Sequence, residues 1–270
     1  MKLSGTNLAA PVARAPRRRR QWLRLLLGFV MSVGFVVFLA WPSLLLLFKQ
    51  YFTPAGSLMP TLQVGDIVIA SLLAYGLSRH SHAGLGQLFP ERLWAARPRR
   101  GDVAIVKLPR DGQTDYVKRV IGLPGERIQM REGRLYIDDT LVARDPAPPA
   151  TVADRNGDPK QVPTYVETLP GGVRHAIIEI DGDRGALDNT QVFEVPPDHY
   201  FLMGDNRDNS TDSRLPASSG LGFVPFDNFV ARALMITWSA SPIAGKAPRT
   251  QSEGAAPTEV NWDRVFTWIR

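Results

Sequence analysis

The sequence predicts a mostly β protein that follows one membrane-spanning helix. Two observations indicate this fold class. Residues 25–48 form an apolar run of 24 residues without a charge, and beyond residue 60 short alternating apolar and polar runs are separated by Gly, Pro and Asp turns. With 270 residues the chain has room for the helix and one or two folded units.

The apolar run 25–48 is long enough to cross a hydrocarbon core of about 30 Å with some tilt. A cleavable signal peptide has an apolar region of only about 7–15 residues, so a permanent anchor is predicted. The length also disfavours a buried core helix. Pro42 lies inside the run and is expected to kink or end the helix.

The net charge of +6 belongs to the N-terminal tail. Residues 1–24 contain seven basic and no acidic residues, which leaves 25 basic against 26 acidic residues in the remainder. This distribution excludes a nucleic-acid-binding face. Because basic segments stay on the cytoplasmic side, we expect the tail 1–24 in the cytoplasm and everything after Phe48 outside, with membrane lipids around the anchor.

The body of the chain, beyond residue 60, is expected to consist mainly of strands and turns. Predicted strands lie in GDIVIASL, GDVAIVKL, DYVKRVIGL, RIQMREGRLYID, VFEVP, HYFLMGD and FVARALMITWS. Residues 76–100 are expected to form a loop, 145–172 part of a loop-heavy insert, and 240–258 a polar connector. The aromatic end NWDRVFTWIR is expected to pack on the body or to touch the bilayer.

Ser57 is the first candidate for chemistry, in the stretch TPAGSLMPTLQVGD that follows the anchor. A serine nucleophile needs a base, a group that orients the base, and donors for the oxyanion. The histidines are poor candidates for that base. His80 and His82 lie in the loop region, His175 in the insert and His199 in a turn, where a histidine is usually a surface residue. The pair HSH also lacks a third metal ligand.

Lys118 is the alternative base. Strand alternation in DYVKRVIGLPG places Tyr116, Lys118 and Val120 on one face, with Val117 and Arg119 on the other. A lysine that shares a face with apolar neighbours is a candidate for burial, which lowers its pKa from about 10.4. Taken by itself, the segment fits a solvated strand lysine better than a buried one.

The segment GDNRDNSTDSR, 204–214, directly follows an apolar strand. Its Asp, Asn and Ser content is compatible with a surface turn, and a calcium loop is the other option. The glycine and terminal glutamate of the EF-hand pattern are missing, which disfavours calcium. Functional polar groups often collect at strand ends.

Taken together, these segments resemble the bacterial type I signal peptidases, or leader peptidases. The likeness rests on GSLMPTL at 56–62, RRGDVAIVKLP at 99–109, DYVKRVIGLPG at 115–125 and GDNRDNSTDSR at 204–214, in that order and behind an anchor. It covers most of residues 50–238.

The resemblance implies roles for five residues. Ser57 looks like the nucleophile and Lys118 like the general base of a Ser-Lys dyad. Ser210 matches the serine that hydrogen-bonds and orients the lysine, while Asp212 and Arg214 match a supporting ion pair. A departure stands at Ala55, where many Gram-negative members have a serine whose hydroxyl joins the oxyanion hole.

The resemblance also implies the domain organisation. We expect a basic tail at 1–24, a signal-anchor at 25–48, a catalytic β core at 50–127 and 196–240, and a C-terminal connector and tail at 241–270. A second β subdomain would be inserted at 128–195. The protein would lie in the bacterial inner (plasma) membrane as a single-pass protein, with the catalytic domain on the periplasmic side.

The substrate implied by the resemblance is a secretory preprotein with small residues at the −1 and −3 positions of its signal peptide. Apolar residues near the dyad are candidates for lining shallow pockets that admit small side chains and keep water from Lys118. These candidates are Leu62, Val68, Tyr116, Val117, Leu202 and Met203. No cofactor and no metal are predicted.

Three alternatives remain open at this point. A peptidase dedicated to one export or conjugation system would share the whole arrangement. An inactive, membrane-tethered binding protein on the same fold is favoured only by Ala55. A self-cleaving transcriptional regulator of the Ser-Lys type would need a DNA-binding domain where this chain has an anchor.

Overall fold

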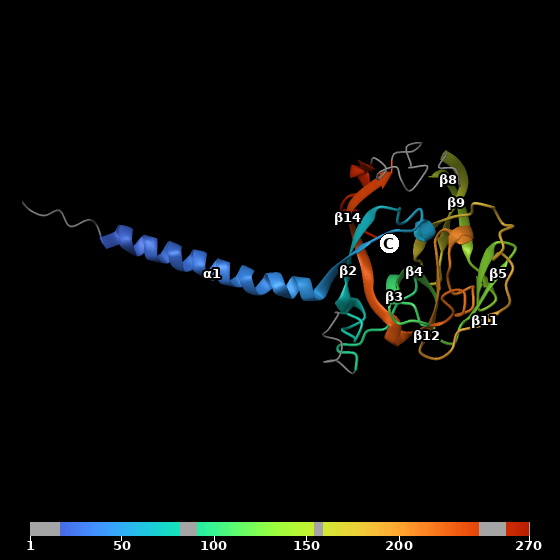
Figure 1. The fold of residues 1–270 in the computed structure, drawn as a ribbon, viewed down its shortest axis with the longest axis horizontal. Helices are drawn as coiled ribbons and strands as arrows, with labels where there is room; N and C mark the ends of the chain where they lie inside the picture. The colour runs from blue at the N-terminus through green and yellow to red at the C-terminus, as the bar shows by residue number, and fades with distance from the viewer. Residues whose placement is uncertain (1–16, 82–90, 154–158, 243–257, 270) are drawn as a thin grey trace, which may run out of the picture. The chain divides into compact units, whose positions relative to one another are not determined.

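The computed structural model describes residues 17–81, 91–153, 159–242 and 258–269. Within those residues the protein has one long N-terminal α-helix and is otherwise built mainly from strands, which confirms the predicted fold class. The chain divides into two compact units, Met1–Leu45 and Leu46–Arg270. Nearly all of α1 lies in the first unit, and the second contains all the strands of the described residues (Figure 1).

Helix α1 extends over Arg17–Leu47. It begins before the predicted residue 25 and so includes part of the basic segment. It continues past Pro42, so the proline does not end it. The stretch Gln21–Leu39 has a mean hydropathy of 2.2, and its side chains are exposed. By length and composition the helix could therefore cross a membrane.

The largest sheet has eight strands, all antiparallel to their neighbours, and forms the expected core. Along its path the strand order is β1-β2-β14-β3-β4-β12-β13, with β15 paired to β14. Its strands are β1 Phe48–Phe52, β2 Asp66–Ser71, β3 Val103–Lys107, β4 Asp115–Gly122, β12 His199–Met203, β13 Val224–Pro225, β14 Phe229–Pro242 and β15 Thr258–Val260.

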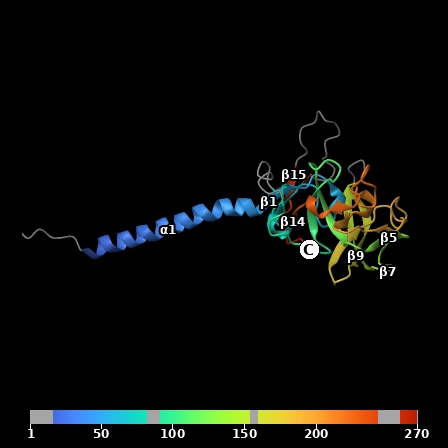
Figure 2. The ribbon, with the colours of Figure 1, turned by 90° about the horizontal axis from the view of Figure 1, so that it is seen from below.

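The intervening strands form two smaller sheets, ordered β11-β5-β6-β7 and β10-β9-β8. Both views place β5 and β9 on the opposite side of the second unit from β14 (Figures 1 and 2). The bounds are β5 Arg127–Arg131, β6 Arg134–Ile137, β7 Thr140–Leu141, β8 Ala143–Ala153, β9 Pro159–Thr168, β10 Arg174–Ile178 and β11 Phe193–Glu194.

The expectation of a loop-heavy segment at 145–172 is wrong, because β8 and β9 occupy most of it. Strand β8 lies at the edge of its sheet, and an edge strand tolerates proline, since one side needs no backbone donor. The pairing register shifts between Ala147 and Ala150, where Pro148 and Pro149 stand. The prolines of this segment therefore belong to an edge strand with a bulge and do not form a loop.

The described parts of 76–100 contain no regular strand or helix, only an isolated bridge between Leu77 and Leu93, which agrees with the predicted loop. Residues 82–90, with His82, and 243–257 of the predicted connector lie outside the described residues. The aromatic end packs on the body. Arg264 Nη2 lies 2.6 Å from Asp66 Oδ2, and the N–H of Ile236 donates to Thr267 O at 2.9 Å.

The smaller sheets share an apolar core with the large sheet. Phe201 and Met203 of β12 pack in one buried cluster with Ile128, Met130 and other residues of the smaller sheets. The Phe201 ring lies 5.0 Å from that of Phe193, centroid to centroid. This shared core explains why 46–270 forms one compact unit, while the domain boundary at 128–195 stays a prediction.

We predict that Phe201→Ala destabilises the folded body by about 3–5 kcal/mol, because the fully buried ring leaves a cavity at this shared core. Denaturant unfolding of the full chain in detergent, followed by tryptophan fluorescence, measures the change. Leu141→Ala, at a side chain that is 44% exposed in β7, is the control and should cost less than about 0.5 kcal/mol. A similar small loss for Phe201→Ala would contradict the shared core.

Candidate active site

Ser57 lies in the 3-10 turn η1, Gly56–Leu58, which follows β1. Asn206, from the segment after β12, holds this turn through two hydrogen bonds. Its backbone N–H donates to Ser57 O at 3.1 Å, and its side-chain Nδ2 donates to Gly56 O at 3.1 Å. The turn is thus attached to the segment 204–214, although almost 150 residues separate the two in sequence.

Lys118 lies in β4 opposite Ala104 of β3, and its Nζ lies 2.6 Å from Oγ of Ser57 in hydrogen-bond contact. The residue is only 4% exposed, which makes it buried, as the resemblance requires; Arg119 on the opposite face of β4 is buried as well, so alternation alone does not account for it. Burial lowers the pKa of Lys118 to about 8, although the carboxylates of Asp212 and Asp205 oppose the shift. A substantial neutral fraction at mildly alkaline pH follows, and a neutral amine can accept a proton from the hydroxyl.

Ser210 is buried beside the Ser57 turn. A Cβ added to Gly204 would lie 2.2 Å from Ser210 Oγ and 2.4 Å from Ser57 O, so the missing side chain lets these groups approach. Within the described residues, the expected hydrogen bond between Ser210 Oγ and Lys118 is not made. The Ser210 hydroxyl lies instead toward Asp212 and contributes to lowering the pKa of that carboxyl. Its role in orienting the lysine stays a prediction.

Asp212 and Arg214 form a buried ion pair with Oδ2 and Nη2 2.9 Å apart. Burial acts to raise the pKa of Asp212, but the Arg214 guanidinium outweighs it and the pKa is lowered. Asp212 Oδ2 also accepts the N–H of Gly204 at 3.0 Å, and Arg214 Nη2 donates to Arg207 O at 2.6 Å. The pair therefore fixes the backbone at Gly204 and at Arg207.

A second buried ion pair was not predicted. Arg119, which follows the lysine in β4, contacts Asp205 through Nε at 2.8 Å and Nη2 at 2.7 Å. Burial acts to raise the pKa of Asp205, but the Arg119 guanidinium holds it well below its ordinary range. Thr61 Oγ1 donates to the same carboxylate at 2.6 Å. Both partners lie in segments that the sequence singled out, but strand alternation could not show that they pair.

His175 is buried, so the prediction that it is a surface residue is wrong. Its Nδ1 lies 3.3 Å from Asp205 Oδ1, and its Nε2 lies 3.5 Å from Glu167 Oε2. Glu167 also pairs with Arg207, whose Nη1 lies 2.9 Å away. β9 and β10 are thereby connected to the segment after β12 through charged groups. Among the described residues, the hydrogen-bond partner of Ser57 Oγ is Lys118 and no histidine.

The six candidate pocket residues do not form one cluster. Leu62 and Val68 belong to the core around β2 and β14, against which Val117 packs. Leu202 and Tyr116 belong to a second cluster, and Met203 to the one shared with the smaller sheets. Tyr116 and Val117 contact the lysine most directly: Nζ is 5.5 Å from the Tyr116 ring centroid and 3.3 Å from Val117 O. Whether the six contact a substrate stays a prediction.

A serine hydroxyl in contact with a buried lysine of lowered pKa is suited to nucleophilic attack on an acyl group. Comparisons with known proteins identify the family. The family described as "Signal peptidase, peptidase S26" matches residues 24–238. The chain therefore belongs to the signal peptidase family, peptidase S26, and is a protease by class.

The curated relatives carry the name "Signal peptidase I". Those of Rickettsia canadensis (strain McKiel) and Rickettsia prowazekii (strain Madrid E) are each 35% identical over 215 residues, covering 77% of this chain and 78% of the relative. That of Rickettsia akari (strain Hartford) is 36% identical over 217 residues, with 77% and 78% covered. A solved signal peptidase I from Enterococcus faecalis V583 is 26% identical, covers 51% of this chain and 97% of its own, and has a TM-score of 0.30.

We predict that Gly204→Ala destabilises the protein by about 1–3 kcal/mol, because the added methyl group overlaps Ser210 Oγ and Ser57 O. Thermal unfolding of the full chain in detergent gives the change. Gly34→Ala, where an added Cβ meets nothing within 4 Å, serves as the matched control and should not lower the Tm. An unchanged Tm for Gly204→Ala would show that the turn does not require the close approach.

Proposed function

We propose that the chain is a membrane-anchored serine endopeptidase that removes N-terminal signal peptides from exported preproteins by a Ser-Lys dyad. The observation that supports the proposal most directly is the 2.6 Å contact between Lys118 Nζ and Ser57 Oγ, made by a lysine that is almost fully buried. Membership of the signal peptidase family supports the substrate class. The non-enzyme alternative, an inactive binding protein, would have no need for a buried amine in contact with a serine hydroxyl.

In the proposed mechanism, neutral Lys118 accepts the proton of Ser57 while Oγ attacks the scissile carbonyl carbon. The resulting ammonium then donates its proton to the leaving amine as the peptide bond breaks, and an ester to Ser57 remains. Water, deprotonated by the same amine, attacks the ester and releases the acyl product. The backbone N–H of Ser57 is the expected oxyanion donor, while the methyl group of Ala55 offers none.

The anchor would place this chemistry next to the bilayer. Only residues 48–56 separate the end of α1 from Ser57, so the length of the chain limits the distance between the serine and the membrane interface. With the arginine-rich tail in the cytoplasm, the second unit would lie on the periplasmic side. There the apolar part of a preprotein's signal peptide ends.

We expect Ser57→Ala and Lys118→Met each to abolish preprotein cleavage, since one removes the nucleophile and the other removes the group that, among the described residues, is in hydrogen-bond contact with its hydroxyl. Activity should fall by at least about 10³-fold, measured by gel assay with purified full chain in detergent. Lys160→Met, at an exposed lysine of β9, is the control and should keep wild-type turnover.

Circular dichroism should show that both inactive variants remain folded. Near-wild-type turnover by either would contradict the dyad. Cleavage of several unrelated preproteins would support general processing, whereas cleavage of one alone would favour a peptidase dedicated to a single export system.

The pH dependence of kcat/KM tests the lysine directly. Because the neutral amine is the active form and the pKa of Lys118 is lowered to about 8, kcat/KM should rise about tenfold per pH unit below pH 8 and level off above it. Steady-state assays between pH 6 and 10 measure this rise. A profile that is flat from pH 6 to 9 would contradict a lysine base.

A further inference from the structure

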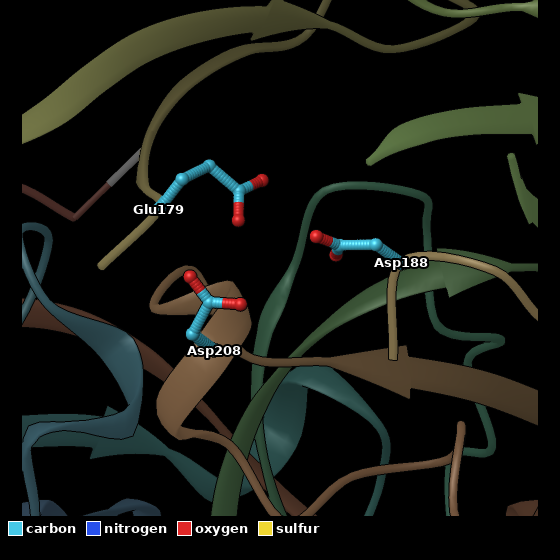
Figure 3. Close-up of side chains that lie close together, drawn as sticks. All are labelled: Glu179, Asp188 and Asp208. Carbon is cyan, nitrogen blue, oxygen red and sulfur yellow. The ribbon is translucent and has the colours of Figure 1, made fainter. Parts of the chain in front are cut away.

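Three carboxylates converge on one space at the far side of the segment 204–214 (Figure 3). Glu179 directly follows β10, Asp188 lies in the segment between β10 and β11, and Asp208 lies in the 3-10 turn η4, Arg207–Asn209. One oxygen atom from each lies within 4.8 Å of the others. These residues play no part in the proposed mechanism.

The Glu179 carboxylate points into this space without a hydrogen-bond partner. Its side chain is 0% exposed, and neither oxygen has a partner within the described residues. The Arg144 guanidinium lies beside it, with Nη1 3.8 Å from Oε1. That guanidinium is already bonded to Asp183 through both terminal nitrogens at 2.9 Å. A fully buried carboxylate with no hydrogen-bond donor and so little positive charge nearby has to be neutralised by a proton or by a bound cation.

The other two carboxylates each accept a hydrogen bond from a backbone N–H. Asp188 Oδ2 accepts the N–H of Gly185 at 2.6 Å, while its buried Oδ1 has no partner among the described residues. Asp208 Oδ2 accepts the N–H of Asp181 at 2.8 Å. These backbone bonds orient the two side chains toward Glu179.

A glycine makes this arrangement possible. A Cβ at Gly185 would lie 1.9 Å from Asp208 Oδ1 and 3.2 Å from Asp188 Oδ2. Any larger residue would therefore push the Asp208 carboxylate out of place. The backbone approaches the carboxylates closely at the point where they converge.

The pKa shifts of the three carboxylates agree with a missing positive charge at their centre. Burial raises the pKa of Glu179 to about 8, against the opposing effect of Arg207, which is itself paired with Glu167. Burial also raises the pKa of Asp188 and of Asp208. The Asp208 carboxylate raises the pKa of Glu179 and of Asp188 further, and Asp188 raises that of Glu179. At neutral pH the cluster is thus short of counter-charge.

We propose that Glu179, Asp188 and Asp208 together bind a divalent cation of the oxygen-preferring class, Ca²⁺ or Mg²⁺. The ligand set is carboxylate alone, with no histidine or cysteine, which excludes a typical zinc site. Oxygens on opposite sides of a calcium ion lie about 4.6–5.2 Å apart, twice the Ca–O distance, and the three oxygens here fit within that span.

A cation at this site ties three chain segments together. It joins the end of β10 to the segment before β11 and to η4, and η4 is followed at once by Ser210. Strand β10 belongs to a smaller sheet, so the cation fastens that sheet to the segment carrying Asp212 and Arg214. The cation site does not rest on the proposed function, because the ligands lie outside the Ser57–Lys118 pair.

The test is metal binding by the full chain in detergent, stripped of divalent ions and held at pH 7.5 and constant ionic strength. Titration calorimetry with CaCl₂ and, separately, MgCl₂ gives the affinities, and thermal unfolding gives the effect on stability. We expect a Kd of about 10⁻⁴–10⁻³ M or tighter for the preferred ion. At 10 mM of that ion the Tm should rise by roughly 5 °C.

Two variants remove a ligand charge while keeping the shape of the side chain. Glu179→Gln and Asp208→Asn should each lose most of the Tm rise and weaken binding at least about tenfold. Asp181→Asn is the matched control, because it removes an exposed carboxylate of the same segment that is no member of the cluster. It should keep the binding and the Tm rise.

Wild-type protein whose Tm and calorimetric signal respond to neither ion would overturn the proposal. So would a Glu179→Gln variant that still shows the full Tm rise. If Glu179→Gln were simply more stable than wild type, with no response of either protein to the ions, the cluster would hold a shared proton and the proposal would be wrong. Loss of activity in Ser57→Ala leaves the metal binding unaffected, so the two proposals fail separately.

Discussion

The exclusion of one lysine amine from water is the constraint on which the rest of this structure depends. Lys118 is almost fully buried, in contact with the Ser57 hydroxyl, and this burial lowers its pKa to about 8. An ammonium group in water at neutral pH has no lone pair for the hydroxyl proton. The strand, the turn and the loop around the pair therefore have to keep solvent away while leaving the hydroxyl accessible to a substrate.

The structure meets this constraint with apolar strands on either side and with ion pairs that are themselves buried. Arg119–Asp205 and Arg214–Asp212 flank the lysine, and each carboxylate is neutralised by its own arginine. Unpaired, those carboxylates would raise the pKa of Lys118 more strongly. A buried ion pair contributes little net stability, but the loss of one partner is costly, so such pairs specify one arrangement of the 204–214 segment.

The inserted strands contribute to the same segment from the other side. Glu167 of β9 contacts Arg207, and His175 of β10 contacts Asp205. The shared apolar core around Phe201 joins the smaller sheets to the large sheet. The carboxylates of Glu179, Asp188 and Asp208 add a third connection when a divalent cation neutralises them. Together these contacts relate the smaller sheets to the support of the proposed dyad, which explains why a proline-rich region of the chain is nevertheless folded into strands.

The sequence by itself determined the elements whose signals are local. The apolar run identified α1, and period-two alternation identified β2, β3, β4, β12 and β14 of the large sheet but not β1, β13 or β15. Four ordered motifs indicated Ser57, Lys118 and the Asp212–Arg214 pair. The resemblance also paired Lys118 with Ser57, and the tertiary structure shows their contact across 61 residues. Only the tertiary structure decided the other distant pairs: Arg119 with Asp205, and the buried His175 with Glu167. It also showed β8 at a sheet edge, where its prolines are tolerated, and Ser210 without the expected lysine contact. The physical reason is that alternation assigns a residue to a face of a strand, whereas burial and charge pairing depend on what another part of the chain brings to that face.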